Sequence, residues 1–305
     1  MPHPFSLSTS WNAGSQTSGR DIIEEIKKAG FDSAELGFNL TRQIVEDIIK
    51  LVETGSIAVN SIHNFCPIPD NTSPAQASPD YFPLSSPDRS IRRMAIDQTK
   101  QTIDYAVRLH SKAVILHMGR VEIGDKTRKL AYLVLNGKDS TGLRAQMIND
   151  RMRSSKNFLD SAIESLKELV DYSKRSSIKL AVENRYYFRE IPSIDELRTI
   201  FGHFNDNEVF YWHDTGHAQV FENLGFGRHK DYLDSFSNRI IGMHIHDIIG
   251  IDDHRPPLSG DLDFSLIMPY IKREDILKVI EIHQPANESE VRRSLEQLVK
   301  LLKMG

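Results

Sequence analysis

The stretch Phe210-Tyr-Trp-His-Asp-Thr-Gly-His217 is an apolar run that ends in a carboxylate and an imidazole. It predicts a strand that stops at Asp214, followed by a Thr-Gly turn that carries His217. Both side chains can then face one polar point at the end of the strand. A carboxylate and a neutral imidazole are ligands that zinc, manganese or cobalt accept together. A plain surface turn is the alternative for this motif alone, so the rest of the chain has to decide.

Short apolar runs alternate with longer amphipathic segments along the whole chain. The expected strands are 5–8, 34–38, 57–63, 113–117, 179–183, 209–214, 240–246 and 277–283, and the expected helices are 18–30, 41–53, 90–109, 157–174, 193–201, 264–271 and 287–303. This alternation predicts an α/β fold, a single (β/α)8 TIM barrel domain over residues 1–305. A doubly wound open sheet is the alternative, but no Gly-x-Gly-x-x-Gly turn follows the first strand.

Two long segments follow the third and fourth strands, at 66–88 and 119–154. The second carries enough basic residues for a local positive surface: Arg120, Lys126, Arg128, Lys129, Lys138, Arg144, Arg151 and Arg153. Long loops at this end of a barrel shape its pocket or a contact between subunits. We expect one of these roles, and assembly into a homo-oligomer stays open.

Composition narrows the class of protein. The chain has 305 residues, 39% of them apolar and 26% charged, with a formal net charge of -4. It lacks the global positive field of a typical nucleic-acid binder, although a local DNA groove stays open. The only cysteine, Cys66, excludes an intrachain disulfide and a thiolate zinc site. Without a leader-like start or an apolar run of about 18 residues, we expect a cytoplasmic protein with no membrane partner.

Acids and histidines gather where the predicted strands end. They are Glu35, His63, His117, Glu183, Asp214, His217, His244, His246, Asp247, Asp252, His254, Glu281 and His283. Structural roles alone would scatter such groups over both ends of the barrel, whereas reactive groups collect at its C-terminal end. Four of them, Glu183, Asp214, His244 and Glu281, come from successive strands and can converge on one divalent ion.

Four motifs carry a resemblance to a known superfamily. They are Val182-Glu-Asn184, His213-Asp-Thr-Gly-His217, Met243-His-Ile-His-Asp247 and the loop 252–264, Asp-Asp-His-Arg-Pro-Pro-Leu-Ser-Gly-Asp-Leu-Asp-Phe. The chain resembles, over nearly its whole length, the xylose-isomerase-like TIM barrels, which include sugar and sugar-phosphate isomerases and epimerases, dehydratases and endonuclease IV. The loop departs from the usual superfamily pattern at residues 258–261.

The epimerase branch of that resemblance implies a one-ion site. Its residues matching Glu183, Asp214, His244 and Glu281 hold one divalent ion, and the two glutamates act as catalytic base and acid. The ion would be manganese, zinc, cobalt or magnesium, and no organic cofactor is expected. The expected reaction is isomerisation or epimerisation of a small sugar, sugar phosphate or polyol-derived substrate through a metal-stabilised enediolate. The substrate-binding candidates are His217, Arg185, His63 and His246, with packing or a salt bridge as the alternative for the last three.

A hydrolase is the rival interpretation. Endonuclease IV holds three zinc ions, and this chain offers further matching ligands in His63, His117, His217, Asp252 and His254. Clustered ions of this kind activate water and neutralise both oxygens of a phosphodiester. Against it, this chain has Met118 and Gly216 where that enzyme has proline and cysteine. A dehydratase stays open because it begins with the same proton abstraction, and a barrel that only binds ranks last.

Overall fold

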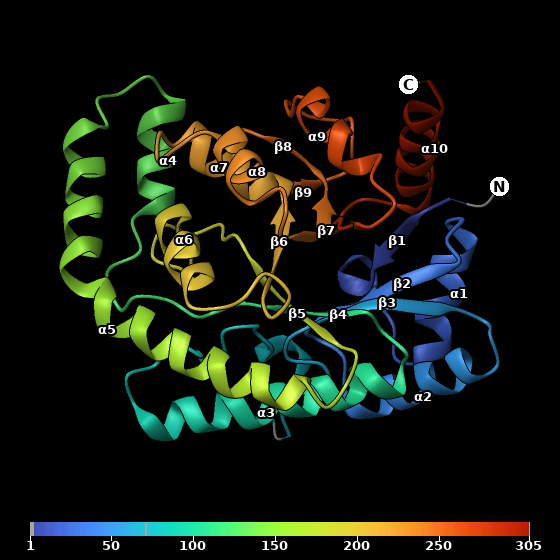
Figure 1. The fold of residues 1–305 in the computed structure, drawn as a ribbon. Coiled ribbons are helices and arrows are strands. Elements are labelled where there is room, and N and C mark those ends of the chain that lie inside the picture. The colour runs from blue at the N-terminus through green and yellow to red at the C-terminus, as the bar shows by residue number, and fades with distance from the viewer. Residues whose placement is uncertain (1–2, 71, 305) are drawn as a thin grey trace.

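The computed structural model describes residues 3–70 and 72–304. Within them, eight strands close into a parallel barrel in the order β1-β10-β7-β6-β5-β4-β3-β2 (Figure 1). They are β1 (Phe5–Ser8), β2 (Ser33–Leu36), β3 (Ala58–His63), β4 (Ala113–Leu116), β5 (Lys179–Glu183), β6 (Phe210–Asp214), β7 (Ile240–Ile245) and β10 (Leu277–Ile280). Pairing of β1 with β10 closes the ring, so the predicted α/β barrel is confirmed.

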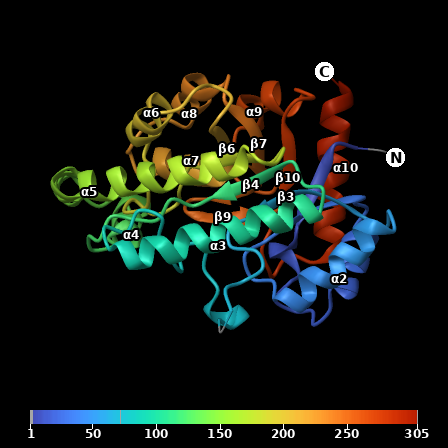
Figure 2. The same ribbon diagram turned by 60° about the horizontal axis from the view of Figure 1, so that its bottom comes forward.

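Helices cover the outside of the barrel (Figure 2). They are α1 (Gly19–Lys28), α2 (Arg42–Glu53), α3 (Arg89–Arg108), α4 (Thr127–Leu135), α5 (Thr141–Ser173), α6 (Ile194–Gly202), α7 (Thr215–Asn223), α8 (His229–Phe236), α9 (Phe264–Ile271) and α10 (Glu288–Met304), with 3-10 turns η1 (Thr9–Trp11) and η2 (Pro74–Gln76). Local capping fixes where they start: the Ser18 hydroxyl accepts from the backbone of Asp21, and Ser193 forms a capping box with Glu196. None of the described helices is long and apolar enough to cross a bilayer.

With the C-terminal ends of the strands taken as the top, the barrel interior is apolar in its lower part and polar in its upper part. Its lower layer is a small cluster of buried residues: Ala113, Ile115, Ala181, Trp212, Ile241 and Val279. Side chains two apart on a strand share a face, so residues two positions further along point into the same interior. These are the predicted polar groups, for example Asp214 above Trp212 and Glu183 above Ala181. Strand alternation therefore places the acids and histidines together at the C-terminal mouth.

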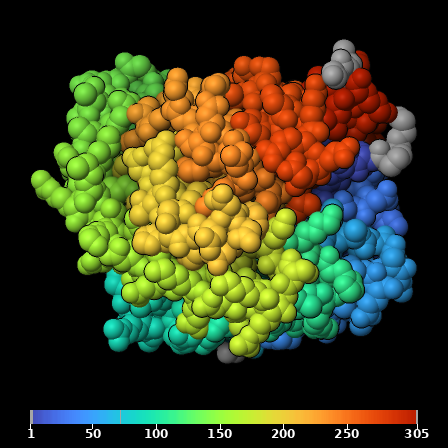
Figure 3. Space-filling model, viewed as in Figure 1, coloured from blue at the N-terminus to red at the C-terminus, as the bar shows by residue number. Residues whose placement is uncertain are grey.

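The segment after β4 is more ordered than its polar sequence suggests. We expected an irregular insert over 119–154 and a helix from residue 157, but α4 lies within the insert and α5 begins at Thr141. The first half of α5 runs beside α4 before the helix changes direction (Figure 1), and the two form the green ridge at the left of the space-filling view (Figure 3). Arg151 is buried and pairs with Glu196 at 2.5 Å, so the basic residues do not all form a positive surface.

Candidate metal centre

The four predicted ligands meet at the mouth of the barrel. Each of Glu183, Asp214, His244 and Glu281 offers one ligand atom, these atoms lie within 4.8 Å of one another, and all four residues are buried. His244 Nδ1 is at the centre, 2.8 Å from Glu183 Oε1, 3.0 Å from Glu281 Oε2 and 3.5 Å from Asp214 Oδ2. Three oxygens and one nitrogen thus face a single point.

This cluster needs a positive charge. Burial alone would lower the pKa of His244, but Glu281, Glu35 and Glu183 around it raise that pKa well above its usual value. Burial likewise raises the pKa of Glu183 and of Glu281, yet the neighbouring His244 charge holds both well below their usual range. A divalent cation would supply the charge directly. The donor set of three carboxylates and one imidazole fits manganese, cobalt, zinc or magnesium.

A buried glutamate supports His244 from behind. Glu35, at the end of β2, is fully buried, and its Oε1 lies 3.0 Å from His244 Nε2. The Ser61 hydroxyl donates to Glu35 Oε2 at 2.7 Å. A carboxylate on the far nitrogen fixes the ring orientation and leaves Nδ1 free for a ligand. The sequence shows Glu35 at a strand end, but its role could not be predicted because the pairing is across the barrel.

Asp214 is held by its own helix and by a neighbouring loop. The predicted Thr-Gly turn is in fact the first turn of α7, whose N-cap is Asp214, and the backbone N–H of His217 donates to Asp214 Oδ1 at 2.8 Å. The side chain of Asn184 accepts from Asp214 N and donates to Asp214 O. The helix dipole and the His217 N–H therefore orient this carboxylate, while Asn184 fixes the backbone that carries it.

His246 lies behind Asp214 rather than in the pocket. It is fully buried, and its Nε2 lies 3.0 Å from Asp214 Oδ1. It is absent from the pocket lining, so the expected substrate contact is replaced by support of the aspartate. Gly216 makes this approach possible, because a Cβ at that position would overlap the His246 ring.

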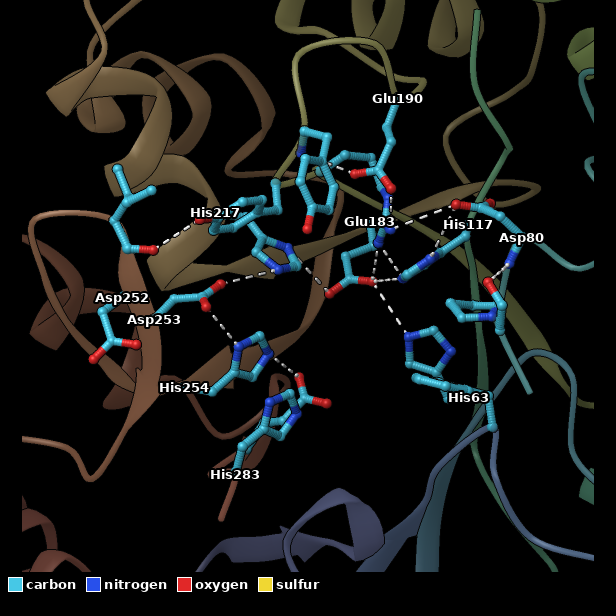
Figure 4. A pocket seen from close by; sticks show the side chains of 18 of the residues that line it. His63, Asp80, His117, Glu183, Glu190, His217, Asp252, Asp253, His254 and His283 are labelled. Carbon is cyan, nitrogen blue, oxygen red and sulfur yellow. Dashed lines mark hydrogen bonds and ion pairs between the residues drawn. The ribbon is translucent and has the colours of Figure 1, made fainter. Parts of the chain in front are cut away.

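A cavity of about 560 Å³ opens above the cluster (Figure 4). The other substrate-binding candidates, His63, Arg185 and His217, all line it. Both long segments reach it as expected, the first through residues 78–80 and the second through Arg128. The loop after β5 adds Tyr186, Tyr187 and Glu190, which sequence reasoning did not select because they follow the strand end by several residues.

The stretch after β7 is a hairpin, β8 (Asp247–Ile249) with β9 (Asp252–Arg255), where we expected a loop. Asp252 lies at the open edge of the cavity, with a side chain 74% exposed and paired with Arg255 at 2.7 Å. Asp253 points inward, 3.1 Å from His254 Nδ1 and 3.6 Å from His217 Nε2 (Figure 4). The structure therefore places Asp253, not the predicted Asp252, beside the other candidate ligands.

The charges and ring contacts around Asp253 and His254 agree with this placement. Burial would raise the pKa of Asp253, but the charge of His254 beside it lowers that pKa to about 2. The His254 ring stacks between His246 and His283, at centroid distances of 4.2 and 3.8 Å. Stacking between two rings fixes the orientation of His254, whose Nε2 lies 3.6 Å from Glu281 Oε2.

A second histidine group lies on the opposite side of Glu183. His117 Nε2 is 2.7 Å and His63 Nε2 is 3.4 Å from Glu183 Oε2. The Arg185 guanidinium lies against the same group, since its Nη1 contacts His117 Nε2 and is 3.4 Å from Glu183 Oε2. Burial and the Arg185 charge hold the pKa of His117 well below its usual value, which keeps its imidazole neutral.

Two acids hold Arg185 from its other side. Its Nη2 lies 3.2 Å from Glu190 Oε1 and 3.7 Å from Asp80 Oδ2. Asp80 comes from the segment after β3, and burial raises its pKa to about 6. Neither acid was selected from the sequence, because neither ends a strand and both lie in irregular segments.

Comparisons with known proteins agree with the barrel fold. The family described as xylose isomerase-like TIM barrel matches residues 23–302. An uncharacterized protein of Methanocaldococcus jannaschii is 22% identical over 260 residues, covering 79% of this chain and 84% of its own. Among solved structures, a D-tagatose 3-epimerase-like protein aligns at TM-score 0.69 and 19% identity over 99% of both chains. The 3-keto-D-glucoside 4-epimerase of E. coli aligns at 0.68 and 15%, over 98% of this chain and all of its own. Such identities show a shared fold, while the match over residues 23–302 shows that this chain belongs to the xylose isomerase-like TIM barrel family.

Proposed function

We propose that this chain is a divalent-metal-dependent isomerase or epimerase that moves a proton within a small polyhydroxylated substrate. The observation that carries the proposal is the four-ligand group of Glu183, Asp214, His244 and Glu281, buried at the base of a polar cavity. A divalent ion held there would polarise oxygens on adjacent carbons of a substrate and so acidify the C–H bond between them.

Glu183 and Glu281 are the proposed proton-transfer groups. They end β5 and follow β10, on either side of the two strands that carry Asp214 and His244. A divalent ion beside them would favour their ionised forms, as the His244 charge does in its absence, so either could accept a proton. One carboxylate can remove a proton from one side of a substrate carbon, and the other, once it has taken up a proton from solvent, can deliver that proton to the opposite side.

The remaining walls suit hydroxyl groups. His63, His217 and His254 present ring nitrogens to the cavity, and Tyr186 and Phe38 add ring surfaces. A few polar groups against aromatic walls are the usual construction of a sugar-sized site. The two fold neighbours named above are described as epimerases of sugars or as similar to one, which supports this class of substrate.

A multi-zinc phosphodiester hydrolase is the second candidate. Two further groups of side chains could each hold an ion: His63, His117 and Glu183, and Asp214, His217 and His254. Two observations weaken it: the Asp252 side chain is 74% exposed and pairs with Arg255, and Arg185 lies against the first group. A dehydratase remains compatible with the same four ligands, because its first proton abstraction is the same.

Proton exchange with solvent tests the proposal. Protein loaded with Mn²⁺ is incubated in D2O with a panel of ketoses and keto acids, and NMR follows the carbon next to each carbonyl. We expect deuterium at that carbon together with an isomer or epimer of at least one substrate, and loss of both in Glu281→Gln. Loss of a hydroxyl as water would indicate the dehydratase. No exchange with any substrate, together with zinc-dependent cleavage of abasic-site DNA, would refute the proposal in favour of the hydrolase.

A further inference from the structure

We propose that the Arg185 guanidinium occupies the position of a second metal ion and thereby limits this centre to one. The inference rests on the proposed one-ion site. It concerns the histidine group of His63, His117 and Glu183, whose two imidazoles take no part in the proposed proton transfer.

That group has the composition of a metal site. His63 Nε2 and His117 Nε2 both approach Glu183 Oε2, and the three residues offer ligand atoms within 4.8 Å of one another. All three are buried. Two imidazoles and one carboxylate oxygen are a donor set that zinc accepts, with a fourth position left open.

Arg185 engages the atoms that such an ion would use. Its Nη1 contacts His117 Nε2 and lies 3.4 Å from Glu183 Oε2. A guanidinium has donors only, so an atom that accepts from it directs a lone pair at it and cannot give that lone pair to a metal. The guanidinium stays charged at all working pH values, so it also repels an incoming divalent ion.

The arginine cannot readily move aside. Its side chain is 6% exposed, and Glu190 and Asp80 hold its Nη2. Glu190 is fixed in turn, because its Oε2 accepts from the backbone N–H of Tyr187 at 2.9 Å. With Glu183, three carboxylates surround this one cation. The charge of Arg185 is therefore already balanced within the protein, which favours the salt bridge that was the alternative to substrate binding for this residue.

Metal stoichiometry tests the inference without any substrate. Full-length protein without an affinity tag is saturated with zinc, freed of excess metal and measured by elemental analysis, with titration calorimetry as a second count. We expect one ion in the wild type, two in Arg185→Ala and one again in the double variant Arg185→Ala/His117→Ala. Arg128→Ala is the matched control, since Arg128 lines the same cavity but contacts Tyr187 instead of a histidine. It should retain one ion.

The possible results separate this inference from the proposed function. One ion in both the wild type and Arg185→Ala would overturn the role of Arg185 and leave the one-ion centre intact. No ion in the wild type would refute the centre itself, and two or more would overturn the inference directly. If Arg185→Ala does not fold, His117→Ala alone decides. Because His117 is not a ligand in this account, its removal should keep one ion at an affinity within about threefold, and loss of an ion would refute the inference.

Discussion

Replacing Glu35 with glutamine should weaken metal binding without unfolding the barrel. Glu35 is fully buried and accepts from Ser61, and its carboxylate lies 3.0 Å from His244 Nε2. Glutamine has the same shape, its oxygen can still accept from His244, and its amide can donate to the Ser61 hydroxyl. The change therefore removes the negative charge behind the central imidazole and little else.

The expected loss follows from the role of such supporting carboxylates. Removing a partner of a metal-binding histidine typically costs 10- to 100-fold in metal affinity, which corresponds to about 1.4–2.7 kcal/mol. Both atoms of this pair have no solvent contact to screen their interaction, so we expect a value within that range. Ser61→Ala removes a donor to the same carboxylate and should produce a smaller loss in the same direction.

Titration calorimetry with Mn²⁺ on metal-free protein measures the effect, and circular dichroism checks that the fold is retained. Glu196→Gln is the matched control: Glu196 is also a buried glutamate, but it pairs with Arg151 away from the cluster. Its metal affinity should stay within about twofold of the wild type. An equally small change in Glu35→Gln would refute the view that Glu35 orients His244.

Three further predictions concern catalysis and stability. Glu183→Gln and Glu281→Gln should each lower kcat by orders of magnitude once a substrate is found, because each loses a metal charge and a proton-transfer group; near-normal turnover in either would contradict the assignment. Burial lowers the pKa of His229 to about 4, below its ordinary value of about 6.5. The free energy of unfolding should therefore be unaffected by this group above about pH 6.5 and fall by up to about 3 kcal/mol as the pH is lowered to 4, because protonation then favours the unfolded chain. Thermal unfolding of His229→Gln at pH 7.5 and 4.5 should show a smaller drop than the wild type, and an equal drop would exclude this histidine as the cause. Gly242→Ala would place a Cβ against the Trp212 ring, so it should cost about 1–3 kcal/mol and lower Tm, whereas Gly202→Ala, which meets open space, should not.

The convergence of the four candidate ligands could be predicted because a repeating rule places them. In a parallel barrel every strand ends at the same mouth, and alternation fixes which residue of each strand faces inward. That rule brings Glu183, Asp214, His244 and Glu281 together at the mouth, although it points His246 and His283 inward as well. Their convergence needed no knowledge of loops or of the long segments between strands.

The rest of the site depends on backbone geometry that local sequence does not determine. Asp252 and Asp253 are chemically identical neighbours, and only the geometry of the hairpin of β8 and β9 decides which one lies beside His217 and His254. His246 follows the inward alternation up to the end of β7, but the chain then turns into the hairpin and its ring packs against Asp214. Asp80 reaches Arg185 from a segment without regular structure, where no periodicity indicates direction.

The helices that follow β4 before residue 157 could not be predicted, for a similar reason. The first half of α5 has few buried residues, so its amphipathic pattern is weak, and Met147 and Arg151 are the buried ones. Arg151 is held by Glu196, by the Phe188 carbonyl and by the Glu190 carbonyl, all distant in sequence. Long-range contacts of this kind stabilise a helix that local propensity alone leaves undecided.

Metal content per chain tests the central claim most directly. Protein purified without an affinity tag or added metal, then loaded with Mn²⁺ and freed of excess, is measured by elemental analysis beside the variant His244→Ala. The four-ligand centre predicts one ion per wild-type chain and close to none in the variant, whose central nitrogen is gone. An equal metal content in the two proteins, or a wild type that retains no divalent ion, would contradict the account.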